Sequence, residues 1–370
     1  MKNGRPRIVV ECFYQKIKPQ QEVSVMSKKK VYLGLDVHAR HCTLGCMDGR
    51  GNFHGTVTFR TNEKELIHHV DDLQAGKKYL ALEEGPLAYW ISQTLKSYVT
   101  EIVIADPREI PLVSRNARKN DRDDARNLCR LLRMGELRHV YHPEEDHRAV
   151  FKTAVQHYLD CRDHQTNLKR KIKAKYRMWG VVDIDGNSIY NCNKKDHFIR
   201  QIKPIAVRNQ LERMYSLLEI ALHTQSEALK EARRLGARYP EIKEFMKMPG
   251  VGPIGALIFD AYIQTPYRFR TKSEVYKYCK LSVTDKTSDN KPIGYSRLDP
   301  AGNSELKAMS YRTVIAARNM KRTNEVKRYY QDSLKQTKDK THARLNTQRK
   351  IVSVMHGIWR KKEAYKPELF

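Results

Sequence analysis

The feature that most constrains the fold is a succession of short apolar segments between residues 30 and 105. Residues 31–37 are apolar and β-branched and end on an acid, which predicts a buried strand. Residues 41–47 and 53–59 predict two further strands, joined by a hairpin turn at residues 48–51. The elements predicted next are a helix opening at residues 61–65, a strand at 78–83, a helix at 90–95 and a strand at 101–105. This order predicts an α/β domain. It does not by itself identify which α/β fold, because many of them begin with a hairpin.

The second half of the chain is predicted to be helical. Residues 147–178 and 205–235 have apolar positions at helical spacing, and the segment between them is broken by Gly, Asn and Asp. Such a pair predicts an antiparallel, coiled-coil-like arm that holds a partner subunit or nucleic acid. Further helices are predicted at residues 273–279 and 304–320, with a polar, irregular segment between them. The last 40 residues are basic and end in a short amphipathic stretch at residues 351–359.

A glycine-rich turn at residues 248–256 has the form of a helix-hairpin-helix junction. Its glycines would let the backbone approach a phosphate, and the following helix would present its N-terminal amides to that anion. An ordinary junction between two packed helices explains the same residues equally well.

The charge of the chain points to a polyanionic partner. Lys and Arg number 70 against 42 Asp and Glu, a formal net charge of +28. Nucleic acid is the partner expected for such a chain, because neutralised phosphates release condensed counterions. A structural role of the ribosomal type and a charge that serves solubility alone are the alternatives.

Several other features set the expected location of the chain. The sequence contains no run of 18 apolar residues, so we expect no membrane span. Seven scattered cysteines favour reduced thiols in the cytosol. Residues 1–29 lack the features of a secretory signal and are expected to be a disordered basic extension, or translated only from Met26.

Four acids occupy positions suited to metal chemistry. Asp36 and Glu83 end predicted strands, and strand-end acids of an open α/β sheet project into the crevice beyond its carboxyl edge. Asp121 and Asp124 lie three residues apart at the start of a helix, so both carboxylates share one helical face. Converging carboxylates suit hard cations such as Mg²⁺ or Mn²⁺, and two such ions can clamp a phosphodiester. Acids that merely start a helix, and the neighbours Asp123 and Glu84, remain alternatives.

A family resemblance favours the first interpretation. Three stretches resemble, in order and spacing, the acidic motifs of the DEDD transposases, a family that includes the Piv-type DNA invertases and the bridge-RNA-guided recombinases. They are residues 33–38, 82–86 and 119–126, the last of which fits the pattern Lys-x-Asp-x-x-Asp-Ala. The resemblance implies that Asp36, Glu83, Asp121 and Asp124 are the catalytic and metal-binding acids, with two Mg²⁺ or Mn²⁺ ions. It also implies a ribonuclease-H-like (RuvC-like) domain.

The resemblance covers most of residues 30–362 and extends to the C-terminal domain. There the family carries a Ser-Ser-Gly segment with a nucleophilic serine, and residues 280–289 match it. By this resemblance Ser288 is the candidate nucleophile, although Thr287 and Asp289 replace the other two motif residues and Pro300 or Ala301 replaces a family lysine. Ser282 and Ser296 are weaker candidates, and a plain polar loop is the alternative.

The expected domain organisation follows. The domains are a basic extension (1–29), the RuvC-like DEDD nuclease domain (30–145), a helical arm (146–240), a mainly α-helical transposase domain bearing the serine (241–335) and a basic C-terminal helix or tail (336–370).

The expected function is that of a DNA transposase or site-specific recombinase. The resemblance implies cleavage and rejoining through a covalent phosphoserine, a structured guide RNA, and a homo-oligomer, dimer or tetramer, acting at the prokaryotic nucleoid in the cytoplasm. One rival is a RuvC-like endonuclease that uses metal-activated water. The other is a catalytically silent nucleic-acid-binding derivative of a transposase.

A second constellation, of His38, His41, Cys42 and Cys46, could suggest zinc. Its spacing matches no usual zinc finger, and strand alternation places the two cysteines on one face. We therefore expect them to be core thiols.

Overall fold

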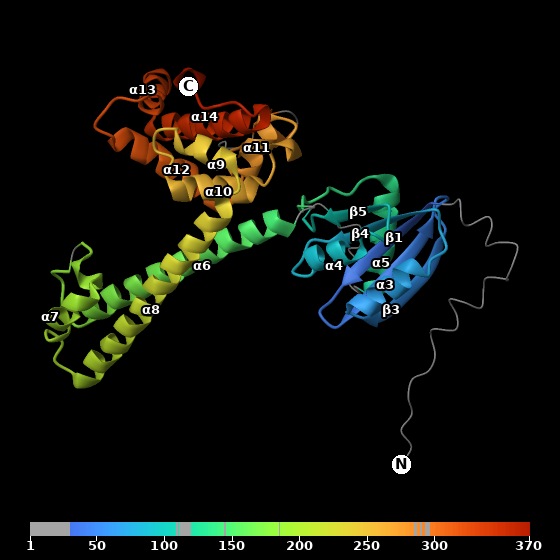
Figure 1. Ribbon diagram of the computed structural model, residues 1–370, viewed down its shortest axis with the longest axis horizontal. Helices are drawn as coiled ribbons and strands as arrows, with labels where there is room; N and C mark the ends of the chain where they lie inside the picture. Colours follow the sequence, from blue (N-terminus) through green and yellow to red (C-terminus); the bar gives the residue numbers. More distant parts are fainter. Residues whose placement is uncertain are drawn as a thin grey trace, which may run out of the picture. The chain divides into compact units, whose positions relative to one another are not determined.

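The computed structural model describes residues 30–108, 110, 120–143, 146–184, 186–284, 287–288, 291–292 and 297–370 (Figure 1). The chain forms two compact units, residues 1–144 and 145–370. The expectation for residues 1–29 lies outside the described residues. None of the helices in the described ranges has the length and apolarity needed to cross a membrane.

The first unit is built on a five-stranded sheet of order β3-β2-β1-β4-β5. β1 pairs antiparallel with β2, and β2 with β3, whereas β4 pairs parallel with both β1 and β5. The strands are β1 (Lys30–Val37), β2 (His41–Asp48), β3 (Phe53–Arg60), β4 (Lys77–Glu83) and β5 (Glu101–Ala105). The predicted order of strands is confirmed, with bounds that shift by one residue at most.

Two helices cover one face of this sheet and a third covers the other. α3 (Glu63–Asp71) and α4 (Ala88–Leu95) share a core with apolar residues of β1 and β4 such as Leu35 and Leu82. α5 (Asp121–Met134) packs on β1 and β2 from the opposite side. The unit is therefore a three-layer α/β sandwich, because each face of the sheet carries apolar residues that require cover.

A pair of glycines determines how closely α5 approaches the sheet. Gly34 and Gly45 are cross-strand partners in β1 and β2. A Cβ atom on Gly34 would lie 2.2 Å from the carbonyl oxygen of Ala125, and one on Gly45 would lie 3.3 Å from the Ala125 Cβ. Only glycine fits at position 34, and Ala125 packs directly on the backbone of the two glycines, where neither strand carries a side chain. The start of α5 is thereby fixed next to the end of β1.

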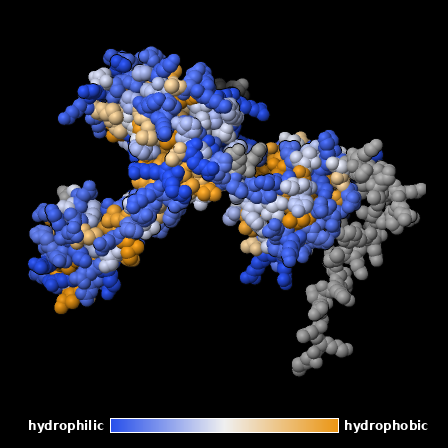
Figure 2. Space-filling view, in the orientation of Figure 1, coloured by the Kyte–Doolittle hydropathy of each residue, from blue (hydrophilic) through white to orange (hydrophobic). Residues whose placement is uncertain are grey.

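The second unit begins with two long helices that pack side by side, α6 (Asp146–Met178) and α8 (Ile205–Gly236) (Figure 1). Between them lie the short helices η1 (Ser188–Tyr190), η2 (Cys192–Lys194) and α7 (Lys195–Ile199). A separate apolar cluster packs these short helices against the C-terminal end of α6 and the N-terminal half of α8. Within it the Tyr215 hydroxyl donates a hydrogen bond to the Ile189 carbonyl at 2.5 Å. Apolar side chains are also exposed around this end (Figure 2), among them Met178 and Val182.

The rest of the second unit is a helical core. Its elements are α9 (Pro240–Met246), α10 (Pro253–Ile263), η3 (Pro266–Arg268), α11 (Lys272–Tyr278), α12 (Ser304–Asn319), α13 (Glu325–Thr337), α14 (Lys340–Lys361) and η4 (Pro367–Leu369). A buried ion pair ties α6 to this core, because Arg148 reaches Asp260 at 2.5 Å and Glu241 at 2.7 Å. Arg148 also lies over the ring of Tyr239.

Two details of this unit differ from what the sequence predicted. The short amphipathic stretch near the C-terminus is part of α14, a 22-residue helix whose Ile351 and Met355 are fully buried. Small and polar positions such as Thr347 interrupt its apolar stripe, so periodicity shows only its last turns. The segment between α11 and α12 contains two pairs of two-residue strands, β6 (Val283–Thr284) with β9 (Arg297–Leu298) and β7 (Thr287–Ser288) with β8 (Lys291–Pro292).

The glycine-rich turn between α9 and α10 serves packing at Gly250. This residue has φ +87°, and a Cβ there would lie 2.3 Å from the Thr313 carbonyl oxygen on α12. The observation favours the helix-junction interpretation for Gly250. At Gly252, in contrast, none of the described residues beyond its chain neighbours comes within 4 Å of the Cβ position.

Candidate metal centre

Asp36 lies at the carboxyl end of β1, on the face of the sheet that α5 covers. Leu35 points into the core on the opposite side, and alternation along the strand places Asp36 on the same face as Gly34. Its side chain is 16% exposed. Because α5 packs closely against Gly34, its first turn lies next to the Asp36 carboxylate.

The start of α5 has the sequence signals of a helix N-terminus. The Asn120 side chain caps the helix by accepting a hydrogen bond from the backbone N–H of Asp123 at 2.9 Å. Acids in the first turn are stabilised by the helix dipole. Asp121 and Asp124 lie on one face of this turn, and Asp123 projects from another.

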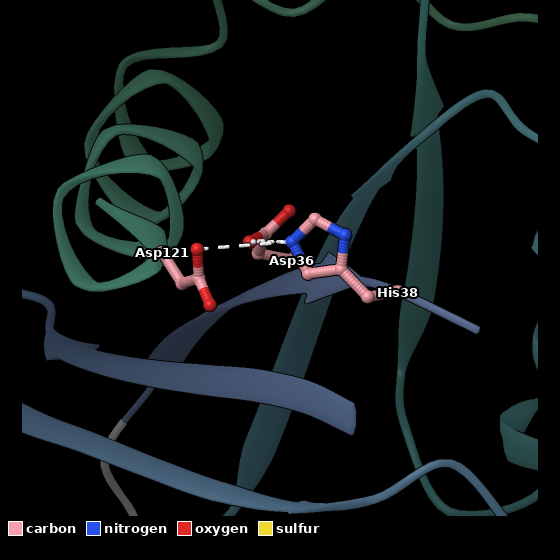
Figure 3. A group of neighbouring side chains, drawn as sticks. All are labelled: Asp36, His38 and Asp121. Carbon is pink, nitrogen blue, oxygen red and sulfur yellow. Dashed lines mark ion pairs between the residues drawn. The ribbon is translucent and has the colours of Figure 1, made fainter. Parts of the chain in front are cut away.

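Three side chains meet where β1 and α5 converge (Figure 3). His38 Nε2 lies 3.2 Å from Asp36 Oδ2 and 3.7 Å from Asp121 Oδ1. One potential ligand atom from each of the three falls within 4.8 Å of the other two. No other set of three such residues in the described ranges is close enough to share a metal ion.

The electrostatics of Asp36 favour a cation at this place. Its Oδ2 is buried, and His38 Nε2 at 3.2 Å is the ionisable nitrogen beside it. Burial raises the pKa of Asp36, and the nearby carboxylates of Asp121 and Asp124 raise it further, while His38 opposes them. A divalent ion would relieve both the burial cost and the repulsion.

Asp124 therefore belongs electrostatically to the same group as Asp121, although it is not one of the three residues in closest contact. Asp123 is not among the charges that shift the pKa of Asp36 most. The structure thus favours Asp121 and Asp124 over Asp123 as the acids of α5 that face β1.

Glu83 lies at the carboxyl end of β4, the strand parallel to β1. Leu35 pairs with Leu82, so the next residues, Asp36 and Glu83, lie side by side at one edge of the sheet. The Glu83 side chain is exposed and is not among the three in closest contact. Its neighbour Glu84 is engaged elsewhere, because its carboxylate lies 2.6 Å from His142 Nε2.

His38 is the residue of this group that the sequence did not single out as a companion of the acids. His38 ends the first family motif, residues 33–38, and the sequence otherwise pointed to it only as part of a zinc set with His41, Cys42 and Cys46. Cys42 and Cys46 are buried in the core of the sheet, as expected, and burial raises the pKa of the Cys46 thiol to about 12. The signal for His38 was its position two residues after Asp36, on the same side of the chain.

Ser288 lies in the second unit, in β7, and its backbone pairs with Lys291 of β8. The side chains of this short strand pair, and residues such as Asp289 and Ser296, are outside the described part of the chain. Ser282 is half-buried, and its carbonyl accepts a hydrogen bond from the Asp299 N–H at 2.9 Å. The candidate nucleophile thus belongs to a hairpin segment between α11 and α12.

Comparison with known proteins gives two family matches and one relative. Residues 33–176 match the DEDD transposases of the IS110 type, and residues 242–331 match the transposase IS116/IS110/IS902 family. The protein y4qE of Sinorhizobium fredii (strain NBRC 101917 / NGR234), named as a transposase, is 25% identical over 249 residues, which cover 62% of this chain and 56% of the relative. The two family matches together cover more than half of the 370 residues and include all four acids and Ser288. The chain belongs to the IS110-type family of DEDD transposases.

Proposed function

We propose that this protein is an active transposase that cuts and rejoins DNA, with a divalent-metal centre in the first unit and a serine nucleophile in the second. The observation that carries the proposal is the convergence of Asp36, His38 and Asp121, whose potential ligand atoms lie within 4.8 Å of one another, with the Asp36 Oδ2 atom buried. Two carboxylates held close together, one of them partly buried, repel each other in the absence of a cation, and such pairs are expected where a divalent cation binds.

The donor set of the first unit fits divalent cations. Asp36, Asp121, Asp124 and Glu83 would supply carboxylate oxygens, the ligands preferred by Mg²⁺ and Mn²⁺. When bound, two such ions would supply Lewis-acid stabilisation of the charge that develops on a phosphodiester during cleavage. The His38 imidazole suits Mn²⁺ better than Mg²⁺, because nitrogen ligands favour transition metals.

The strand order β3-β2-β1-β4-β5, with acids at the ends of β1 and β4, supports a ribonuclease-H-like (RuvC-like) fold for the first unit. The packed pair of α6 and α8 supports an arm of the coiled-coil type. These assignments are part of the proposal, as are the four-acid site and the domain limits given above.

The covalent step falls to Ser288. Its Oγ would attack the scissile phosphorus, forming a serine–phosphate bond while the bond from phosphorus to the leaving deoxyribose oxygen breaks. The serine proton is released, and the leaving oxygen takes up a proton. The phosphodiester is thus exchanged for a phosphoserine ester, which conserves the bond for rejoining. Because a serine hydroxyl is a poor nucleophile by itself, the step requires activation by groups outside its own hairpin.

The remaining parts of the proposal concern partners. A net charge of +28 and membership of the family support binding of DNA. We further propose a structured guide RNA and a homo-oligomer, in which the acids of one subunit act with Ser288 of another, at the prokaryotic nucleoid.

The test is to trap the covalent protein–DNA adduct on a nicked substrate that carries the element's end, with guide RNA and Mn²⁺. Ser288→Ala should abolish the adduct and preserve DNA binding, whereas Asp36→Asn should abolish all cleavage. Thr287→Ala, Ser282→Ala and Ser296→Ala are the matched controls and should keep the adduct.

Each alternative function has its own result in this assay. An adduct that persists in Ser288→Ala would move the nucleophile to another residue. Cleavage by the wild type without any adduct would favour the endonuclease that uses metal-activated water. Binding without cleavage under every condition would favour the silent DNA-binding derivative, with Thr287, Asp289 and Pro300 as the first positions to restore to the family residues.

A further inference from the structure

We infer that a cavity at the base of the serine-bearing hairpin binds one nucleotide of the DNA strand that Ser288 attacks. The inference rests on the proposed function, because it takes Ser288 as the nucleophile. The cavity has a volume of about 520 Å³, within the range of small-ligand sites. It lies wholly within the second unit.

Three elements form the walls of this cavity. Val283 of β6 and Leu298 of β9, which are cross-strand partners, form one wall, and the chain between them contains Ser288. α12 and α14 form the others. These two helices are joined by the buried side chain of Gln348, which donates hydrogen bonds to the Lys307 carbonyl and to the Ser310 hydroxyl. Two walls are therefore tied to each other by hydrogen bonds, and the strands of the third wall flank the chain segment that contains Ser288.

The chemistry of the lining suits a nucleotide. Tyr311 is 42% exposed and offers a ring on which a base can stack. The Arg344 guanidinium lies over this ring, 5.2 Å from its centroid, where it can also stack on a base or contact a phosphate.

The charge of the cavity is also complementary to a phosphate. Lys307, Arg344 and His342 line it, and none of the described lining residues is acidic. Asp339, just outside the lining, lies 3.9 Å from His342. Because the strand held at Ser288 must be DNA, a nucleotide next to the cleaved bond is the occupant that both the position and the chemistry favour.

The first experiment maps the contact by crosslinking. DNA substrates that carry 5-iododeoxyuridine at successive positions around the cleavage site are irradiated with the full-length protein. The expected result is a crosslink to the peptide that contains Tyr311 from one or two neighbouring positions. Crosslinks that map only outside α12 and α14, or that appear only with a 5-iodouridine RNA probe, would overturn the inference.

The second experiment measures affinity for the same DNA by fluorescence anisotropy. Tyr311→Ala should weaken binding at least fivefold, the lower end of what one base–aromatic stack contributes, and Tyr311→Phe should restore it. Arg344→Gln should lower the slope of log K against log salt by about 0.7 to 0.9 if it contacts a phosphate. Tyr267→Ala removes a tyrosine that is 61% exposed and outside the cavity, and it should change nothing.

The results separate this inference from the proposed function. Unchanged affinity in Tyr311→Ala, with normal cleavage by the wild type, would refute the nucleotide site alone. A lower melting temperature of Tyr311→Ala with unchanged binding would show that the cavity serves only folding. A wild type that binds no DNA would refute both proposals.

Discussion

Replacing Asp36 with asparagine removes a charge that the metal-free protein holds at a cost. The Asp36 side chain is 16% exposed, His38 Nε2 lies 3.2 Å from its Oδ2, and a carboxylate oxygen of Asp121 lies within 4.8 Å of an Asp36 oxygen. Two like charges at that distance repel by roughly 3 to 4 kcal/mol at an effective dielectric constant of 20. Because the Asp121 side chain is 60% exposed, solvent screening reduces this to about 1 kcal/mol. We therefore expect Asp36→Asn to stabilise the metal-free first unit by about 1 to 2 kcal/mol, or roughly 5 °C in melting temperature.

The order of stability of the wild type and Asp36→Asn should reverse when metal is added. Mn²⁺ at 100 times its dissociation constant stabilises a protein that binds it by about 2.7 kcal/mol, and Asp36→Asn should gain little of this. The wild type is thus predicted to be the less stable protein in EDTA and the more stable one in Mn²⁺. Hydrogen exchange of β1 and α5, read by mass spectrometry, measures the effect in the first unit without interference from the second.

The pH dependence provides a further check of the same reasoning. The pKa of Asp36 is raised in the folded protein, so the folded state binds this proton more tightly than the unfolded state does. The penalty is absent below the ordinary pKa of about 4 and fully present above the raised value. The advantage of Asp36→Asn in EDTA should therefore disappear as the pH falls through that window.

Asp123→Asn is the matched control, since this acid lies in the same turn of α5 but is not among the charges that shift the pKa of Asp36 most. It should lower the metal-free stability slightly, by up to about 1 kcal/mol through the lost interaction with the helix dipole, and it should leave the Mn²⁺ effect unchanged. If Asp36→Asn destabilised the protein in EDTA, or if it retained the full Mn²⁺ effect, the assignment of Asp36 to a metal centre would be wrong.

Three other predictions follow from packing and charge. Gly34→Ala places a methyl group 2.2 Å from the Ala125 carbonyl oxygen. Urea unfolding should therefore show a free energy of unfolding lower by at least about 1 to 3 kcal/mol, together with weaker Mn²⁺ binding. In the control Gly49→Ala the nearest atom lies at 3.8 Å, and the free energy of unfolding should change by less than about 0.5 kcal/mol. Arg148→Ala leaves the fully buried carboxylate of Asp260 without its partner and should cost about 3 to 5 kcal/mol in guanidinium unfolding. That loss should shrink at acidic pH, because burial raises the pKa of Asp260 and its protonated form is less costly to bury; a loss independent of pH would argue against this cause. Binding to duplex DNA should weaken with salt by about 0.9 in log K per tenfold rise for each phosphate contacted, and a slope near zero would exclude a phosphate-based interface.

The sequence by itself determined the elements of the first unit and the acids at their ends. A buried strand that stops at Asp36 and a helix that starts after Asn120 are local signals, set by apolar alternation and by N-cap chemistry, so they survive without knowledge of the fold. The family motifs then identified the same acids, and the order of the strands predicted that they meet at one edge of the sheet.

Only the tertiary structure decided which side chains share the site. Whether Asp121, Asp123 or Asp124 faces Asp36 depends on the rotation of α5 about its axis, and that rotation is fixed where Ala125 packs over Gly34. Such a contact joins residues about 90 positions apart, so no local pattern contains it. His38 entered the group for the same reason, because its distance to Asp121 is set by how closely α5 can approach β1. The length of α14 was likewise decided by packing, since its buried Thr347 is a polar residue that only a contact with the core places inside.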